Sequence, residues 1–229
     1  MTPQDTLKIV GKIELPAKKR INVYFDGFNF YRGLKEAGWQ KYYWLDILAF
    51  SKALMGKYKD WEVRHVHYYT AKPWGEEKRR NQNILLDANT KYNHGAFTVH
   101  YGSYTSKTID CLATCKETFK WPEEKGADVG VAVDIIGDAL LKRCDVSVLV
   151  SGDNDQLPTL KFIKNNLPHH KIFVFFPPHR NRNALRDHCH YSSHLLSSPH
   201  LLEKCVWPQV VTFPDKTTAT RPEKWPALV

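Results

Sequence analysis

Short runs of apolar, β-branched and aromatic residues recur along this chain, and segments long enough for helices separate them. The clearest runs are 21–26, 145–150 and 171–176. Two more, 62–70 and 96–104, alternate in part between apolar and polar residues. Apolar runs of this length are typical of strands buried between helices, and strands that alternate with helices form parallel sheets. The sequence therefore predicts an α/β sandwich with a mainly parallel sheet.

The segments between these runs are compatible with helices. We expect helices over 29–37, 44–55, 76–92, 127–143 and 156–166, with a short one near 183–190. The mixed stretch 105–124 is predicted to be a loop or small insertion, and 171–176 is the last clear strand. An extended tail is expected from about Trp207. The predicted organisation is a basic arm (1–19), an α/β domain (20–176) and an extension (177–229) that is rich in His and then in Pro.

Composition narrows the class of protein. The 229 residues are 42% hydrophobic and 25% charged, as in globular domains, and no apolar run approaches the ~20 residues of a membrane span. The first residues lack the apolar segment of a secretory signal, which predicts a cytoplasmic protein.

Five cysteines do not suggest a disulfide framework. The net charge of +9 favours anionic partners, of which nucleic acid is the commonest, or serves solubility alone.

Carboxylates stand where predicted strands end and a predicted helix begins. Asp26 follows the first strand, Asp153 and Asp155 follow the strand at 145–150, and Asp128 opens the helix at 127–143. Ligand sites in parallel sheets lie beyond the carboxyl ends of the strands, so these acids are expected to converge. Clustered carboxylates repel one another unless a cation lies between them, and all-oxygen ligands suit Mg²⁺ or Mn²⁺. The alternative for each acid alone is turn chemistry or helix capping.

The predicted helix at 127–143 carries further polar residues. Asp134, Asp138 and Lys142 are spaced four residues apart, which predicts a salt-bridged helix face. Asp134 lies about 120° around the helix from Asp128 by the 3.6-residue period. We therefore expect Asp134 to be a structural or supporting residue.

Three segments together resemble the signature of the NYN domain family, which belongs to the PIN-like nuclease superfamily. They are Asp26-Gly27-Phe28-Asn29, Lys125-Gly126-Ala127-Asp128 with the helix to Asp134 behind it, and the segment from Ser151 to Pro158. The resemblance covers residues 20–176. It implies a Rossmann-like three-layer α/β/α fold and metal-dependent cleavage of RNA, with DNA as a further substrate. It also implies that Asp26, Asp128, Asp153 and Asp155 hold Mg²⁺ or Mn²⁺, with Asn29 as a supporting site residue.

The expected activity is therefore that of a metal-dependent ribonuclease, with endonucleolytic cleavage favoured. Carboxylate-bound ions can supply the attacking water and stabilise the charge of phosphodiester hydrolysis. A phosphatase of the HAD type is one alternative, but its second Asp would stand at Phe28. A non-catalytic nucleic-acid-binding module is the other. No P-loop motif occurs in the sequence.

Basic residues provide candidates for binding the RNA backbone. They are Lys78, Arg79, Arg80, Arg180, Arg182 and Arg186, and their alternative is a solvated surface. The aromatic residues Trp39 and Tyr42–Trp44 are candidates for base stacking or, more commonly, for the core. Cys111 and Cys115, with the seven histidines between 169 and 200, allow a zinc site without a complete motif. Homo-oligomerisation stays open.

Overall fold

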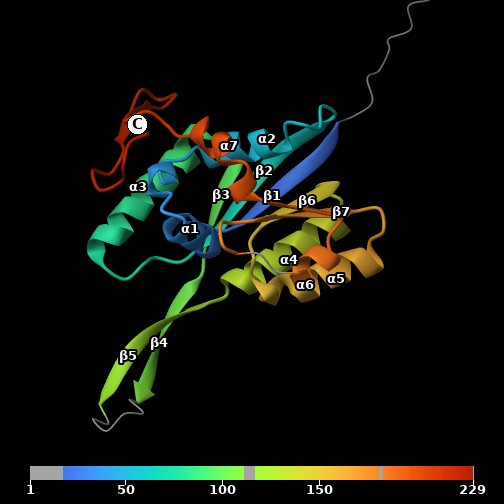
Figure 1. Cartoon of the computed structure of the whole chain (residues 1–229), viewed down its shortest axis with the longest axis horizontal. Coiled ribbons are helices and arrows are strands. Elements are labelled where there is room, and N and C mark those ends of the chain that lie inside the picture. Colours follow the sequence, from blue (N-terminus) through green and yellow to red (C-terminus); the bar gives the residue numbers. More distant parts are fainter. Residues whose placement is uncertain (1–17, 111–116, 181–182, 229) are drawn as a thin grey trace, which may run out of the picture.

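The computed structural model describes residues 18–110, 117–180 and 183–228 (Figure 1). Six strands of this part form a central sheet in the order β3-β2-β1-β6-β7-β8, and every neighbouring pair is parallel. Their bounds are β1 Lys19–Asp26, β2 Trp61–Thr70, β3 Phe97–Tyr101, β6 Val146–Val150, β7 Lys171–Phe176 and β8 Tyr191–His194. The predicted fold class, three layers around a parallel sheet, is confirmed.

Helices cover both faces of the sheet. The first face packs against α1 (Gly27–Glu36), α2 (Ile47–Met55), α3 (Glu76–Tyr92) and α7 (Pro199–Glu203). The second face packs against α4 (Ala127–Leu140), α5 (Leu157–Asn166) and α6 (Asn183–Asp187). The strand β1 shows why: Val23 and Phe25 belong to the first apolar core, whereas Tyr24 belongs to the second. The two-residue period of a strand directs these neighbours to opposite faces.

Most predicted elements are present with shifted ends. The predicted helix at 44–55 begins at Ile47, because Asp46 accepts a hydrogen bond from the N–H of Ala49 at 2.9 Å and caps α2. The helix expected at 127–143 ends at Leu140, and the short one near 183–190 ends at Asp187. No helix among the described residues is long and apolar enough to cross a bilayer.

The sheet has a further strand after 171–176, the last clear strand in the sequence. The strand β8 pairs in parallel with β7, from Phe173↔Tyr191 to Phe176↔His194. Its sequence, Tyr-Ser-Ser-His, has only one apolar residue, so neither composition nor periodicity marks it as a strand. The expected extended tail also contains a small hairpin, β9 (Val210–Thr212) with β10 (Thr218–Thr220).

The stretch 105–124, predicted to be a loop or small insertion, contains parts of two antiparallel strands in its described residues. The strands β4 (Ser103–Asp110) and β5 (Thr118–Lys125) pair from Ser103↔Lys125 to Asp110↔Thr118 and extend away from the layers (Figure 1). The predicted strand 96–104 is therefore divided at Gly102 between β3 and β4. The mixture of Thr, Lys and Glu lacks the apolar alternation of a half-buried strand, which is why the sequence did not indicate the hairpin.

Candidate functional site

Asp26 ends β1 and caps α1. Its Oδ1 accepts a hydrogen bond from the backbone N–H of Asn29 at 3.0 Å, and its Oδ2 accepts one from the hydroxyl of Ser151 at 2.9 Å. The helix can start here only because residue 27 is glycine. A Cβ on Gly27 would lie 2.5 Å from the ring of Tyr68 and 2.7 Å from the carbonyl oxygen of Tyr69. The capping alternative for Asp26 is thus true in part, but each carboxylate oxygen keeps a further lone pair.

The side chain of Asn29 connects α1 to the loop that follows β6. Its Oδ1 accepts a hydrogen bond from the backbone N–H of Gly152 at 3.0 Å. A Cβ on Gly152 would lie 1.9 Å from the carbonyl oxygen of Arg180, so the loops after β6 and β7 touch at this glycine. These contacts fix the carboxyl edge of the sheet around Asp26.

The other three acids come from that loop and from α4. Asp153 accepts a hydrogen bond from the N–H of Asp155 at 3.0 Å and caps the short 3₁₀ turn Asn154–Gln156. Asp128 lies in the first turn of α4, and its carbonyl oxygen accepts a hydrogen bond from the buried side chain of Gln156 at 3.1 Å. Gln156 therefore joins the start of α4 to the Asp153–Asp155 loop.

The acids influence one another electrostatically. Burial raises the pKa of Asp26 to about 7; hydrogen bonds from Asn29 and Ser151 oppose the rise, and the charges of Asp128 and Asp153 add to it. Burial, with the charges of Asp153 and Asp155, also raises the pKa of Asp128. Asp26, Asp128, Asp153 and Asp155 are thus near enough for their charges to interact, although no three of them form a group, among the described residues, whose ligand atoms all lie within 4.8 Å of one another. Carboxylates crowded in this way, with oxygen donors only, fit a hard divalent cation such as Mg²⁺ or Mn²⁺.

The predicted basic residues lie in several places. Lys78, Arg79 and Arg80 are exposed near the start of α3. Arg180 follows β7 at the carboxyl edge, but its guanidinium pairs with Glu36 of α1 and its side chain is only 19% exposed. Arg186, on α6, contacts a ring nitrogen of His194 at 3.2 Å. Arg182 lies outside the described residues, as do Cys111 and Cys115. Figure 1 places α3 and α6 in opposite helical layers, so these residues do not form one patch.

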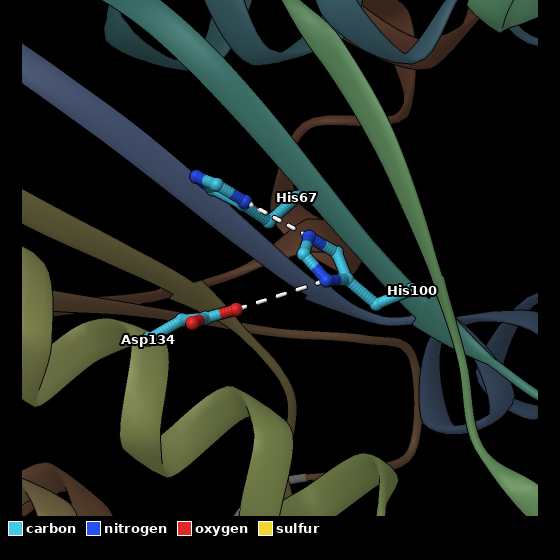
Figure 2. A group of neighbouring side chains, drawn as sticks. All are labelled: His67, His100 and Asp134. Atoms are coloured by element: carbon cyan, nitrogen blue, oxygen red, sulfur yellow. Dashed lines mark hydrogen bonds and ion pairs between the residues drawn. The ribbon is translucent and has the colours of Figure 1, made fainter.

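A second group of potential ligands was not expected. His67 of β2, His100 of β3 and Asp134 of α4 meet on the second face of the sheet (Figure 2). Burial lowers the pKa of His67 to about 4, so its ring is neutral at pH 7. Neither histidine belongs to the histidine-rich segment 169–200, where the sequence allows a zinc site. The pattern His65-Val66-His67 in a predicted strand could have indicated histidine ligands on the sheet, because the two-residue period of a strand directs both rings to one face.

The predicted salt-bridged face of Asp134, Asp138 and Lys142 is not observed. Asp138 is only 4% exposed and accepts hydrogen bonds from Asn22 at 2.7 Å and from Tyr24 at 2.8 Å. Asp134 accepts a hydrogen bond from the hydroxyl of Tyr69 at 2.5 Å. Asp138 is buried against the sheet, whereas Asp134 contacts the sheet through Tyr69 and stays partly exposed, because α4 lies across β1 and β2.

Comparison with known proteins decides the family. The sequence model of the NYN domain matches residues 20–196, most of the chain. The chain belongs to the NYN domain family. The match ends two residues after β8, so the matched domain includes the sixth strand.

Two individual proteins are also similar. A 6-hydroxy-3-succinoylpyridine 3-monooxygenase, HspA of Pseudomonas putida, is 27% identical over 240 residues, which cover 90% of this chain and 75% of that protein. A crystal structure of a protein of unknown function from Vibrio parahaemolyticus superposes with a TM-score of 0.53 at 22% identity. It covers 80% of this chain and 96% of the other, and it supports the fold alone.

Proposed function

We propose that this NYN domain protein is a Mg²⁺- or Mn²⁺-dependent ribonuclease whose ions are held by Asp26, Asp128, Asp153 and Asp155. The family is associated with nuclease activity in general, and RNA and the endonucleolytic mode are the finer parts of the proposal. The observation that carries it is the placement of these carboxylates on adjoining segments at the carboxyl edge of the sheet, which the hydrogen bonds of Ser151, Asn29 and Gln156 link. The cytoplasm remains the predicted compartment.

Each residue of the proposed site has a separate task. A bound divalent ion would activate a water molecule and stabilise the charge on the phosphate. Ser151 and the N–H of Asn29 orient the carboxylate of Asp26. The amide of Asn29 holds Gly152, and Gln156 holds the start of α4, so the acids on the two segments keep their separation. Such positioning reduces the reorganisation that the reaction requires.

Exposed aromatic side chains at the carboxyl ends of β1 and β3 favour a single-stranded substrate. Phe28 follows Asp26 directly, is 50% exposed and carries the guanidinium of Arg32 4.9 Å above its ring. Tyr101, at the carboxyl end of β3, is 48% exposed and lies 5.5 Å below the ammonium of Lys72. Unpaired bases stack on such rings while nearby cations contact the backbone.

The proposal is tested by cleavage of labelled RNA and of single- and double-stranded DNA with Mg²⁺, Mn²⁺ or EDTA. We expect RNA cleavage that needs the ion and is lost in Asp153→Asn. Asp60→Asn is the matched control, because Asp60 is exposed just before β2, at the opposite edge of the sheet. Cleavage that persists in EDTA or in Asp153→Asn would refute the mechanism. RNA binding without turnover would favour the non-catalytic module, and turnover of a small aryl phosphate alone would favour the HAD-type phosphatase.

Hydroxylation of a nitrogen-containing aromatic ring is a second candidate function. The observation that favours it is the monooxygenase name of a relative that aligns with 90% of this chain. The assay measures O₂ consumption with 6-hydroxy-3-succinoylpyridine and a reduced nicotinamide donor. Substrate-dependent O₂ uptake, with no cleavage of nucleic acid, would replace the nuclease proposal.

A further inference from the structure

The residues His67, His100 and Asp134 come from three elements and converge on one point of the second face. Tyr69↔His100 and His67↔Thr98 are paired in the register of β2 and β3, so the two histidines lie diagonally across neighbouring strands. Nδ1 of His67 lies 3.0 Å from Nε2 of His100, and Nδ1 of His100 lies 3.8 Å from a carboxylate oxygen of Asp134 (Figure 2). One donor atom of each residue lies within 4.8 Å of the donor atoms of the others.

Surrounding side chains hold these donors in place. The ring of His67 stacks on Tyr24 at 5.1 Å and 7°, and the ring of His100 stacks on Tyr69 at 4.5 Å and 14°. The hydroxyl of Tyr69 also donates to Asp134. The outer nitrogen of His67, Nε2, lies 3.8 Å from Oδ2 of Asp138. A carboxylate behind the outer nitrogen of a histidine is the arrangement that orients imidazole ligands in metal sites.

We infer that His67, His100 and Asp134 bind a divalent first-row transition-metal ion at a site separate from the four aspartates. Two imidazoles and one carboxylate suit Zn²⁺ or Fe²⁺, whereas Mg²⁺ prefers oxygen ligands alone. Three protein ligands leave a coordination position for water or for a ligand, as in catalytic zinc sites. The side chains of His100 and Asp134 are 33% and 37% exposed, so an ion reaches them from solvent.

The two sites share a helix without sharing a ligand. Asp128 and Asp134 are six residues apart on α4, which is about 9 Å along the helix axis. The histidine site joins β2 and the edge strand β3 to α4, where α4 contacts both strands. It does not depend on the proposed nuclease activity, because no nucleic acid or Mg²⁺ takes part in it.

The test is direct metal binding by the full chain after treatment with EDTA. Co²⁺ is titrated first, because Co²⁺ bound by imidazole and carboxylate absorbs visible light, and Zn²⁺ is then used to displace it. We expect one Co²⁺ site per chain that resists displacement by excess Mg²⁺, and an affinity loss at this site of about tenfold or more in His100→Ala and in Asp134→Asn. His94→Ala is the matched control, because His94 is exposed in the turn before β3.

Asp153→Asn separates this site from the proposed nuclease site. It should abolish Mn²⁺-dependent cleavage and leave Zn²⁺ affinity unchanged. Circular dichroism of the metal-free variants checks folding, and the partly exposed His100 and Asp134 carry the test if the more buried His67→Ala does not fold. Equal Co²⁺ affinity in native protein and in folded His100→Ala, or the absence of Co²⁺ absorption, would overturn the inference and leave a hydrogen-bonded polar cluster.

Discussion

The hydroxyl of Ser151 donates a hydrogen bond to the carboxylate of Asp26 over 2.9 Å, and so joins the loop after β6 to the end of β1. The same hydroxyl oxygen accepts a hydrogen bond from the backbone N–H of Asp153 at 3.0 Å. One buried serine therefore sets the separation of two of the proposed metal ligands. Because Asp26 is part of this hydrogen-bond network, its ionisation can be tested by protein stability alone, without a substrate.

Asp26→Asn should stabilise the metal-free protein at neutral pH. The pKa of Asp26 is raised to about 7, mainly by burial, from an unfolded value near 4. The folded state therefore binds a proton more tightly, and stability that is present below about pH 4 is lost as the pH rises through about 7. In EDTA at pH 8 we expect the variant to be more stable by about 1–2 kcal/mol, or roughly 2–8 °C in Tm.

Thermal unfolding in EDTA at pH 5 and pH 8 checks this prediction. The difference in Tm between Asp26→Asn and the native protein should be smaller at pH 5, where native Asp26 is mostly protonated. Asp60→Asn serves as the control and should follow the native profile. Parallel pH profiles for native protein and Asp26→Asn would show that Asp26 ionises normally.

Ser151→Ala should lower both stability and cleavage. The substitution leaves the N–H of Asp153 and one oxygen of Asp26 without this hydrogen-bond partner. Leaving a buried polar group unpaired lowers the free energy of unfolding by roughly 1–3 kcal/mol. Ser147→Ala, on the preceding strand β6, is a matched control, because buried Ser147 bonds to His170 at 2.8 Å, away from the four proposed metal ligands. Urea unfolding should show similar losses in both variants, but only Ser151→Ala should cleave RNA more slowly. Equal cleavage rates would contradict a positioning role for Ser151.

Much of the site could be predicted because strand ends are visible in the sequence. The apolar run 21–26 ends in Asp26 and the run 145–150 is followed by Asp153, and parallel strands place their carboxyl ends at one edge. The strands β1 and β6 are neighbours in the sheet, as the convergence of these acids requires. Recognising the strand ends and the rule that ligand sites lie at the carboxyl edge of a parallel sheet was enough to predict where these acids lie.

The histidine cluster depends on information that one sequence does not display. His67 and His100 meet because β2 pairs with β3 in one register, and Asp134 joins them because α4 crosses the same face. Helical spacing alone assigned Asp134 to a polar stripe with Asp138, although both acids face polar side chains of the sheet. The strand β8 was missed for a related reason, since its pairing with β7, and not its composition, makes it a strand.

Gly152→Ala should destabilise the protein severely. The added Cβ would lie 1.9 Å from the backbone oxygen of Arg180, which no side-chain rotation can relieve. We expect a loss of about 3 kcal/mol or more, in the range of overpacked sites. The control is Gly137→Ala in α4, where nothing lies within 4 Å of the new Cβ and alanine should stabilise the helix by about 0.5–1 kcal/mol. A Gly152→Ala variant with native Tm would mean that the loops after β6 and β7 do not touch in solution.

The exposed start of α3 should contribute to RNA binding. Lys78, Arg79 and Arg80 follow the carboxyl end of β2, the edge that carries the acids, whereas the guanidinium of Arg180 is already paired with Glu36. Contacts with phosphates release counterions, so affinity should fall with salt by a log–log slope of about −0.7 per neutralised phosphate of a single strand. We expect Arg79→Ala with Arg80→Ala to weaken binding and to flatten that slope by about one unit.

A salt titration of RNA binding in Ca²⁺ or EDTA measures this slope while cleavage is blocked. Lys59→Ala with Lys161→Ala is the matched control, since it removes the same charge from exposed residues before β2 and on α5. Net charge alone would lower the slope equally in both double variants, because the two proteins lose the same number of cations. A larger change in the α3 variant identifies α3 as part of the RNA path, and equal slopes would assign these arginines to a solvated surface.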